Sequence, residues 1–222
     1  MNKKKLPQRT IRARKINAAL KKIFPHPKIA LRYKTPWELV VAVQLSAQCT
    51  DKKVNEITPA LFKRYKTLRA YTKADPREFQ KYIFQAGFFR AKTRNILAAA
   101  KMVTNHYRGT LPKTIKEMIH IPGIGRKSAN VILGNAYGVV EGIAVDTHVR
   151  RLCWKLGITD HKDPVKIERD LMALLPKKDW FLFTYRIIEY GRQICPARKH
   201  DCAGHPLTRI CPLAEHRWIS KK

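Results

Sequence analysis

Acidic residues are scarce in this chain of 222 residues. There are 16 Asp and Glu against 46 Lys and Arg, and the formal net charge is +30. Self-repulsion of this size opposes a compact state, so the composition favours a polyanionic partner. Simple solubility, or association with the ribosome, is the alternative explanation. Charge alone does not separate DNA from RNA, because both are first contacted through phosphates.

Long apolar runs are missing as well. No segment approaches the length of a membrane span, and no apolar signal-peptide core follows the basic N-terminus. Residues 1–22 lack serine, and apolar residues recur there at roughly helical spacing. We therefore expect a basic tail leading into a docked helix, and not a transit peptide.

Strand-like patterns are almost absent. Only residues 143–145 resemble a strand, and three residues do not make a sheet. Amphipathic spacing recurs along the rest of the chain, which predicts an all-α protein. Beyond the N-terminal helix, the expected helices cover about residues 36–47, 51–65, 76–87, 89–107, 114–120, 125 onward, 147–156, 164–175 and 180–194.

Several of these helices have recognisable start signals. Residues 35–38 (Thr-Pro-Trp-Glu) and 75–78 (Asp-Pro-Arg-Glu) each combine a capping residue, a proline at the first helical position and a capping-box glutamate. Asp51 is expected to cap the helix that follows it.

Glycine is also sparse, yet two of the ten glycines fall within residues 121–127, Ile-Pro-Gly-Ile-Gly-Arg-Lys. Glycines permit backbone angles closed to other residues, and Pro122 pre-sets the entry to the turn. A capping box at residues 114–117 precedes the segment, and an apolar run at residues 128–133 follows it. The pattern predicts a helix-hairpin-helix whose second helix points N–H groups outward, an arrangement that binds phosphate.

Lys127 would lie in the first turn of that second helix. The helix dipole and Arg126 both disfavour the ammonium form there, and a partly neutral lysine is a nucleophile. Asp146 follows nineteen residues later. The alternative is a plain turn with Lys127 as a surface charge, and an Asp146 that only caps the helix starting at Thr147.

The five cysteines are unevenly distributed. Cys49 and Cys153 lie in helical patterns, whereas the other three fall within residues 195–211. Such clustering in a chain without a signal peptide favours a metal site over disulfides.

Taken together, these segments resemble the endonuclease III branch of the helix-hairpin-helix DNA glycosylases. The resemblance runs from about Ile16 to Cys211, and five landmarks appear in order: residues 45–48, 86–89, 121–127, 145–148 and the cysteine-bearing tail. It implies two helical lobes, one of residues 30–137 ending in the helix-hairpin-helix and the other of residues 1–29 with 138–222. Lys127 and Asp146 would face a DNA cleft between the lobes.

The resemblance also implies an activity, that of a bifunctional DNA glycosylase and abasic-site (AP) lyase of base-excision repair. An oxidised pyrimidine is rotated out of duplex DNA, and Lys127 displaces it at C1′. The resulting Schiff base leads to β-elimination on the 3′ side, while Asp146 stabilises positive charge on the sugar and assists proton transfers. His148 either orients Asp146 or only packs. The expected protein is monomeric, cytoplasmic and nucleoid-associated, with no membrane attachment.

DNA contacts are carried over in the same way. Gln48 resembles the family residue that fills the gap left by the flipped nucleotide. Phe88 stands where the family usually has an aliphatic wedge, and it either intercalates or packs in the core. The full set of expected DNA-binding residues is Gln48, Phe88, Ile121, Gly123, Gly125, Arg126, Arg198 and Lys199.

The tail departs from the family in one residue. Endonuclease III has four cysteines there, with gaps of six, two and five residues, which hold a [4Fe-4S] cluster. This chain keeps the gaps with Cys195, Cys202, His205 and Cys211, so histidine replaces the third cysteine. In order of preference, the four residues hold an iron–sulfur cluster, hold zinc, or hold no metal.

Two other functions stay open at this point. One is a glycosylase of the same superfamily that removes thymine or uracil opposite guanine, since lesion choice depends on pocket shape. The other is a non-catalytic helix-hairpin-helix module that only binds DNA. Relatives that remove adenine from mismatches have no lysine at the position of Lys127 and place a glutamate near Ala47, so the sequence argues against that branch.

Overall fold

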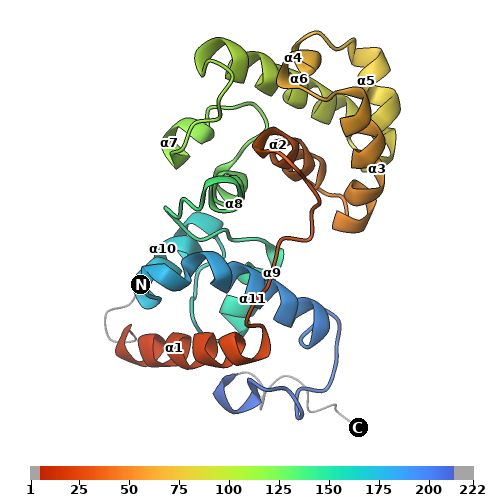
Figure 1. The fold of residues 1–222 in the computed structure, drawn as a ribbon. Coiled ribbons are helices and arrows are strands. Elements are labelled where there is room, and N and C mark those ends of the chain that lie inside the picture. Colours follow the sequence, from red (N-terminus) through yellow and green to blue (C-terminus); the bar gives the residue numbers. More distant parts are fainter. Residues whose placement is uncertain (1–5, 213–222) are drawn as a thin grey trace. The chain divides into compact units, whose positions relative to one another are not determined.

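Residues 6–212 are described by a computed structural model, and every regular element in this range is helical. The all-α prediction is therefore confirmed, and residues 143–145 form no strand. The chain divides into two compact units. One is formed by Ile29–Glu141, and the other by the segment up to Lys28 together with the segment from Gly142 onward. Figure 1 traces both.

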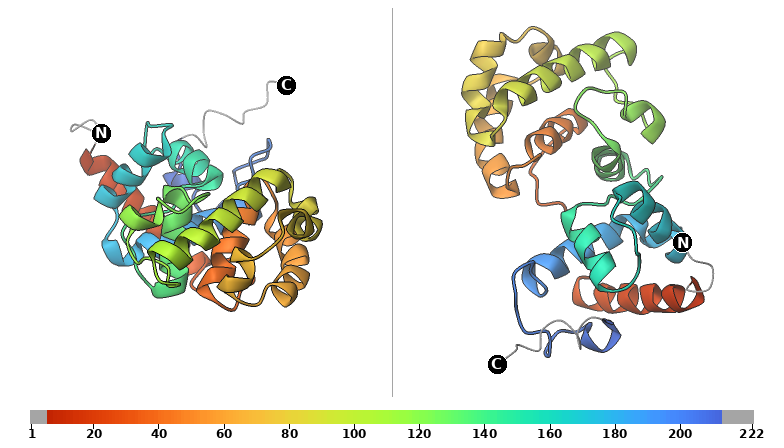
Figure 2. Two further views of the ribbon diagram at one scale, coloured as in Figure 1. Left: turned by 90° about the horizontal axis from the view of Figure 1, so that it is seen from above. Right: turned by 180° about the vertical axis from the view of Figure 1, so that it is seen from behind.

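Three helix pairings dominate the packing of the Ile29–Glu141 unit. The long helix α6 packs along α4 and α5, and α2 packs against α8, as Figure 2 also shows. Its elements are α2 (Pro36–Leu45), α3 (Asp51–Arg64), α4 (Leu68–Thr72), α5 (Pro76–Ile83), the 3₁₀ turn η2 (Phe84–Ala86), α6 (Phe89–His106), α7 (Ile115–Met118) and α8 (Arg126–Tyr137).

The other unit joins distant parts of the sequence. Its first helix packs against helices near the C-terminal end of the chain, α1 against α10 and α11, while α9 packs against α11. Its elements are α1 (Leu6–Ile23), α9 (Thr147–Lys155), α10 (Pro164–Leu174), the turn η3 (Lys177–Asp179), α11 (Trp180–Gln193) and the turn η4 (Thr208–Ile210). The docked N-terminal helix is thus confirmed, although residues 1–5 of the expected basic tail lie outside the described residues.

The predicted helix starts are confirmed by their hydrogen bonds, with one exception. Thr35 and Asp75 accept from the backbone N–H of Glu38 and Glu78 at 3.1 and 2.7 Å. The expectation that Asp51 caps α3 is wrong. Thr50 is the capping residue, and its hydroxyl oxygen accepts from the Lys53 N–H at 3.2 Å. Sequence spacing missed the five-residue helix α4 and the 3₁₀ turns, which are too short to show a period.

Among residues 6–212, no helix combines the length and the apolar character needed to cross a membrane.

A buried carboxylate ties the N-terminal helix to the C-terminal half of its unit. Asp179 accepts from the side-chain amide of Asn17 at 2.8 Å and pairs with the Lys21 ammonium at 2.7 Å. Burial opposes ionisation of Asp179, but the hydrogen bonds from Lys21 and Asn17 and the charges of Lys21 and Arg186 outweigh it. The net result is a lowered pKa for Asp179. The ionised carboxylate therefore contributes to the stability of this unit.

We predict that Asp179→Asn lowers the free energy of unfolding by about 1–3 kcal/mol at neutral pH, because it removes the charge that Lys21 and Asn17 bind. A lowered pKa gives stability that is present above the unfolded-state value of about 4 and is lost as the pH falls through the folded-state value. The deficit should therefore shrink below about pH 4. Chemical denaturation of variant and wild type at both pH values measures it.

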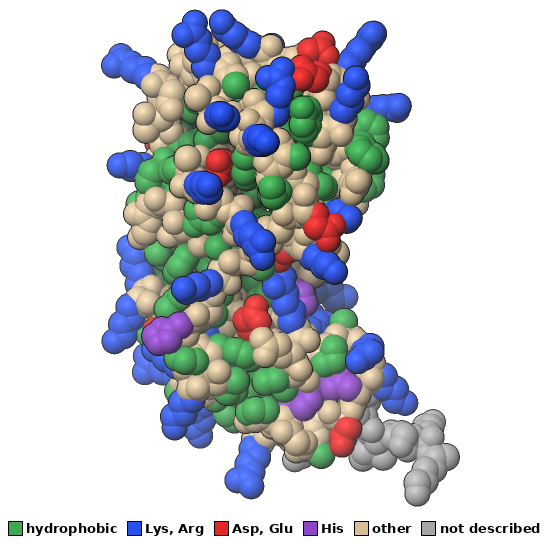
Figure 3. Space-filling model, turned by 45° about the vertical axis from the view of Figure 1, so that its right-hand side comes forward, with side chains coloured by type: hydrophobic (Ala, Val, Ile, Leu, Met, Phe, Trp, Pro, Cys, Tyr) green, Lys and Arg blue, Asp and Glu red, His purple; other side chains and the backbone are tan. Residues whose placement is uncertain are grey.

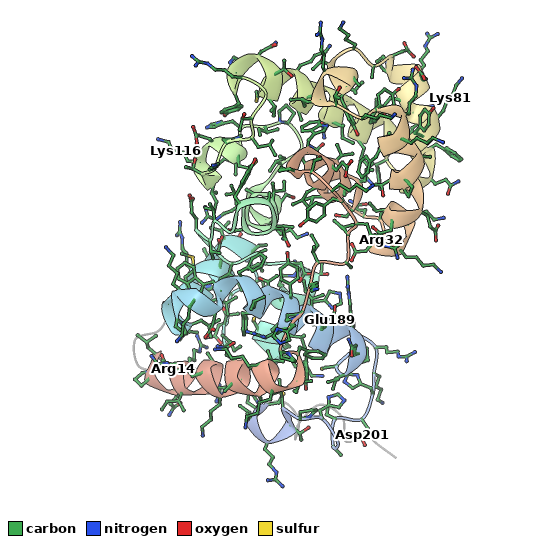
Figure 4. The ribbon with its side chains drawn as sticks, viewed as in Figure 1. Arg14, Arg32, Lys81, Lys116, Glu189 and Asp201 are labelled. Carbon is green, nitrogen blue, oxygen red and sulfur yellow. The ribbon has the colours of Figure 1, made fainter. Side chains whose placement is uncertain are left out.

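The matched control is Glu189→Gln on α11 (labelled in Figure 4), which removes a half-buried carboxylate that lies 3.6 Å from Arg192 and accepts from the Gln193 side-chain amide at 2.6 Å, both within one turn of the same helix. Its effect should stay within about 0.5 kcal/mol. Equal effects of the two substitutions, or an Asp179→Asn deficit that does not change with pH, would contradict the assignment.

Candidate active site and metal centre

The hairpin between α7 and α8 is anchored by its isoleucines. Ile121 and Ile124 are 1% and 4% exposed, and the Ile124 N–H donates to the Ile121 carbonyl at 3.0 Å. Their side chains therefore fix the hairpin to the core. The DNA contact expected of Ile121 is consequently restricted to its backbone, because its side chain is not accessible.

The two hairpin glycines differ in what they require. Gly123 has φ +79°, and a Cβ there would lie 2.8 Å from Oε1 of Gln44 and 3.0 Å from Cβ of Asn95. Gln44 in turn donates to the Pro122 carbonyl at 3.1 Å, so the hairpin backbone lies directly against α2. Glycine is needed at position 123 for both conformation and space.

At Gly125 neither the backbone conformation nor the available space requires a glycine. The expectation that both glycines take backbone angles closed to other residues is therefore wrong for Gly125. Its φ of −93° is open to any residue. No atom lies within 4 Å of the position that a Cβ would take, and the residue is exposed. A glycine with no internal requirement at the start of a helix leaves room for a ligand to approach the backbone.

Lys127 lies where the sequence predicts, in the first turn of α8. Helix α8 begins at Arg126 without a side-chain cap, in contrast to α2, α3 and α5, whose first turns are capped. Both Arg126 and Lys127 are exposed. The first N–H groups of α8 and two basic side chains thus share one exposed helix start, which is the arrangement that attracts phosphate.

Asp146 does cap α9. Its Oδ1 accepts from the Val149 N–H at 2.8 Å, and the residue is half-buried. The capping role is thus real and fixes the position of the carboxylate. It does not exclude a chemical role, because a cap engages one of the two oxygens. Asp146 belongs to the unit that begins again at Gly142, whereas Lys127 belongs to Ile29–Glu141.

His148 is packed rather than exposed. A Cβ added to Gly191 would lie 2.8 Å from its Nδ1, so α9 and α11 approach closely at this ring. Burial lowers the pKa of His148, Asp146 raises it in part, and Arg151 and Arg192 lower it further. Next to it, a hollow of about 790 Å³ is lined by Thr147, His148, Arg150, Arg151, Trp154, His161, Lys162 and Ala197.

Gln48 and Phe88 share an unusual backbone conformation. Their φ angles are +52° and +48°, the left-handed region, which is uncommon outside glycine. Both side chains are exposed, Phe88 by 68%, so Phe88 is not the buried core residue that was its alternative. Gln48 lies in the middle of the short loop between α2 and α3, and Phe88 directly precedes α6; both loops belong to the Ile29–Glu141 unit.

The four predicted metal ligands come together. Cys195, Cys202, His205 and Cys211 line one small hollow, beside Tyr190 and Lys155. All five cysteines of the chain are free thiols. Burial raises the pKa of the Cys202 thiol, an effect that Lys155 opposes. A convergent set of three thiols and an imidazole fits a metal ion or cluster in its choice of donors.

The loop is held from α9. Arg151 donates to the carbonyls of Cys195 and Pro196 at 2.8 and 3.2 Å, and the Lys155 ammonium lies 3.4 Å from the Cys195 sulfur. The Thr208 hydroxyl donates to the Cys202 carbonyl.

His200 is a candidate ligand that sequence spacing missed. Its ring stacks on His205 with centroids 5.0 Å apart, and its Nε2 lies 3.6 Å from the Cys202 sulfur. The ligand atoms of Cys195, His200 and His205 all lie within 4.8 Å of one another. In the sequence His200 is one member of a basic loop, and only side-chain packing distinguishes it.

The same loop exposes Arg198 and Lys199. Basic side chains are also spread widely over the face of the molecule in Figure 3, where Asp and Glu are few. The charge excess of the sequence is therefore displayed at the surface.

Comparison with known proteins identifies the class. Residues 41–177 match the family model for HhH-GPD superfamily base excision DNA repair proteins. The chain is 44% identical to endonuclease III of Synechocystis sp. over 96% of its own length and 97% of that protein. It is 43% identical to endonuclease III of Bacillus subtilis, over 88% and 89% of the two chains. The chain therefore belongs to the endonuclease III family within this superfamily.

A solved structure agrees. A non-covalent endonuclease III–DNA complex is 37% identical to this chain and superposes with a TM-score of 0.88, covering 92% of this chain and 96% of that one. The predicted resemblance is confirmed.

Proposed function

We propose that this protein is a bifunctional DNA glycosylase and AP lyase of base-excision repair, acting on duplex DNA. The observation that carries the proposal is Lys127, exposed in the uncapped first turn of α8 directly after the hairpin. The substrate class within this activity is oxidised pyrimidines. An enzyme of this kind works where chromosomal DNA is, so a nucleoid-associated location is part of the proposal.

The proposed reaction gives Lys127 and Asp146 different roles. The Lys127 amine attacks C1′ of the flipped nucleotide, the glycosidic bond breaks, and the base leaves with its electron pair and a proton. The amine then forms a Schiff base with the opened sugar, and loss of a C2′ proton expels the 3′ phosphate. Asp146 as an ionised carboxylate stabilises positive charge on the sugar and carries protons.

DNA binding is assigned to the backbone of the hairpin and to exposed basic residues. Gly125 lets a phosphate approach the first N–H groups of α8, beside Arg126. Gln48 and Phe88 enter the duplex in place of the flipped nucleotide. The likeness to endonuclease III does not favour the mismatch or the non-catalytic alternative. A pure binder would use the hairpin amides and have no need of Lys127.

Borohydride trapping on an abasic or thymine-glycol duplex tests the nucleophile. Wild type should give a covalent adduct, and Lys127→Ala should reduce trapping and strand cleavage by roughly a thousandfold or more, because the Schiff base cannot form. Lys116→Ala is the control, since Lys116 is an exposed lysine on α7 of the same unit and is labelled in Figure 4. Adduct formation by Lys127→Ala at the wild-type level would refute the mechanism.

Asp146→Asn separates the capping role from the chemical one. Asparagine caps helices about as well as aspartate, so the melting temperature should stay close to that of wild type. The excision rate under single-turnover conditions should fall by roughly a hundredfold, because the amide carries no negative charge. Asp146→Ala loses the cap as well and should also be less stable by about 1 kcal/mol. If Asp146→Asn excised the base at the wild-type rate, Asp146 would only cap α9 and would have no chemical role.

We also propose that Cys195, Cys202, His205 and Cys211 hold a [4Fe-4S] cluster, with zinc as the alternative. The proposal rests on the four residues lining one hollow beneath Arg151 and Lys155. When bound, the metal would cross-link the loop that presents Arg198 and Lys199. It has no part in breaking the glycosidic bond.

Anaerobically purified protein should show iron–sulfur absorption in the visible range and about four iron atoms per chain. His205→Ala should lose most of the metal, while His26→Ala, an exposed histidine remote in sequence from the loop, should keep it. His200→Ala tests the additional ring directly, and metal loss there would make His200 a ligand. Zinc without iron would establish the alternative, and the absence of both metals would contradict a metal site.

A further inference from the structure

Lys92 is one of four buried basic residues among residues 6–212, together with Arg9, Lys155 and Arg186, and of these four it alone belongs to the Ile29–Glu141 unit. It lies in the first turns of α6 and is 6% exposed, in a chain with 46 Lys and Arg. Its ammonium donates to the carbonyl of Leu45 at 2.8 Å and to that of Ala86 at 2.6 Å. One buried cation thus joins the end of α2 to the end of η2, two segments far apart in the sequence.

The two acceptors lie a few positions before Gln48 and Phe88, two of the three exposed non-glycine residues with a left-handed φ among residues 6–212. Leu45 is the last residue of α2, three positions before Gln48. Ala86 ends η2, two positions before Phe88. A left-handed conformation in a residue other than glycine costs energy and persists only where the surroundings hold it. The Lys92 ammonium holds the backbone close to both residues, because it binds the Leu45 carbonyl and the Ala86 carbonyl at once.

The chemistry of lysine suits this position. An ammonium offers three donors on a compact centre, so a single small group can serve carbonyls that converge on it from different directions. Burial lowers the pKa of Lys92, and the nearby Cys49 opposes this. Lys92 is also bonded through its own backbone N–H to the Phe88 carbonyl at 3.1 Å, so it touches the second loop twice.

We propose that Lys92 is a positioning residue that locks the Gln48 and Phe88 loops to one another, so that both side chains enter the duplex as one preformed wedge. This inference rests on the proposed function, in which these two residues fill the gap left by the flipped nucleotide. Lys92 itself would not touch DNA.

Hydrogen exchange of the free protein tests whether Lys92 holds the two loops together, without any assay of activity. Lys92→Met keeps the apolar stem and removes the donors. Amides of residues 46–50 and 84–90 should then exchange at least about tenfold faster, with the rest of residues 29–141 unchanged. Val103→Ala is the matched control, because it opens a buried position on the same helix α6 away from both loops. The proposal would be overturned if these amides exchanged no faster in Lys92→Met than in Val103→Ala.

A double-mutant cycle tests the functional consequence. In single-turnover excision from a lesion duplex, Lys92→Met and Phe88→Ala should each slow the reaction, by roughly tenfold for Lys92→Met. The double variant should be little slower than Phe88→Ala alone. Once the Phe88 ring is removed, loosening its loop no longer displaces a side chain that the reaction needs. Effects that multiply fully would mean that Lys92 acts through global stability, and they would overturn the proposal.

The same data separate failure of this inference from failure of the proposed function. If exchange shows both loops loosened while Phe88→Ala and Lys92→Met excise at the wild-type rate, the tie is real and the wedge role of Phe88 is refuted. If Phe88→Ala is slow and Lys92→Met matches Val103→Ala in both exchange and rate, the wedge stands and the role of Lys92 is refuted.

Discussion

Buried donors that bind loop carbonyls hold the irregular parts of this protein in place. A buried cation without a partner and a buried carbonyl without a donor are each costly, and the pairing removes both costs at once. Gln44 donates to a carbonyl of the hairpin at Pro122, and Lys92 donates to carbonyls beside two loops. Arg151 donates to the carbonyl at the start of the cysteine loop. Each loop proposed to contact DNA or metal is therefore held by a side chain that binds its backbone on the side facing the core.

This arrangement explains how a strongly basic chain can stay folded. Most of its charge faces solvent, where screening weakens repulsion and phosphates can neutralise it. The few cations taken inside are directed at carbonyl dipoles, at carboxylates or, in the case of Lys155, at cysteine sulfurs. Arg186, for example, donates to the carbonyls of Phe24 and Pro25 at 3.1 and 3.3 Å, where the N-terminal segment leaves α1.

Sequence reasoning succeeded where the cause is local. Caps, prolines at the first helical position and amphipathic spacing act within one turn, so the helices could be predicted to within a few residues of their ends. It failed at Gly125 and Asp51 because a glycine or an aspartate near a helix start is compatible with more than one backbone geometry. Lys92 and His200 could not be found, since their burial depends on contacts with residues far away in the sequence.

The hairpin shows how structure refines a motif. Gly123 is required by the fold, because its backbone angle and the contact with Gln44 both exclude a side chain. Gly125 is required by neither, and the open space beside it is free for the phosphate that the proposed function places at the start of α8. The motif therefore contains one glycine that the fold requires and one that the proposed DNA contact uses.

Helix α9 connects the proposed catalytic carboxylate to the cysteine loop. Asp146 caps its first turn, Arg151 binds the loop carbonyls from its middle, and Lys155 at its end lies against the cysteine sulfurs. The cysteine loop and Asp146 are therefore positioned by the same nine-residue helix. His205 lines its hollow together with Lys155, at the opposite end of α9 from Asp146, so the replacement of a cysteine there leaves the proposed reacting groups unchanged.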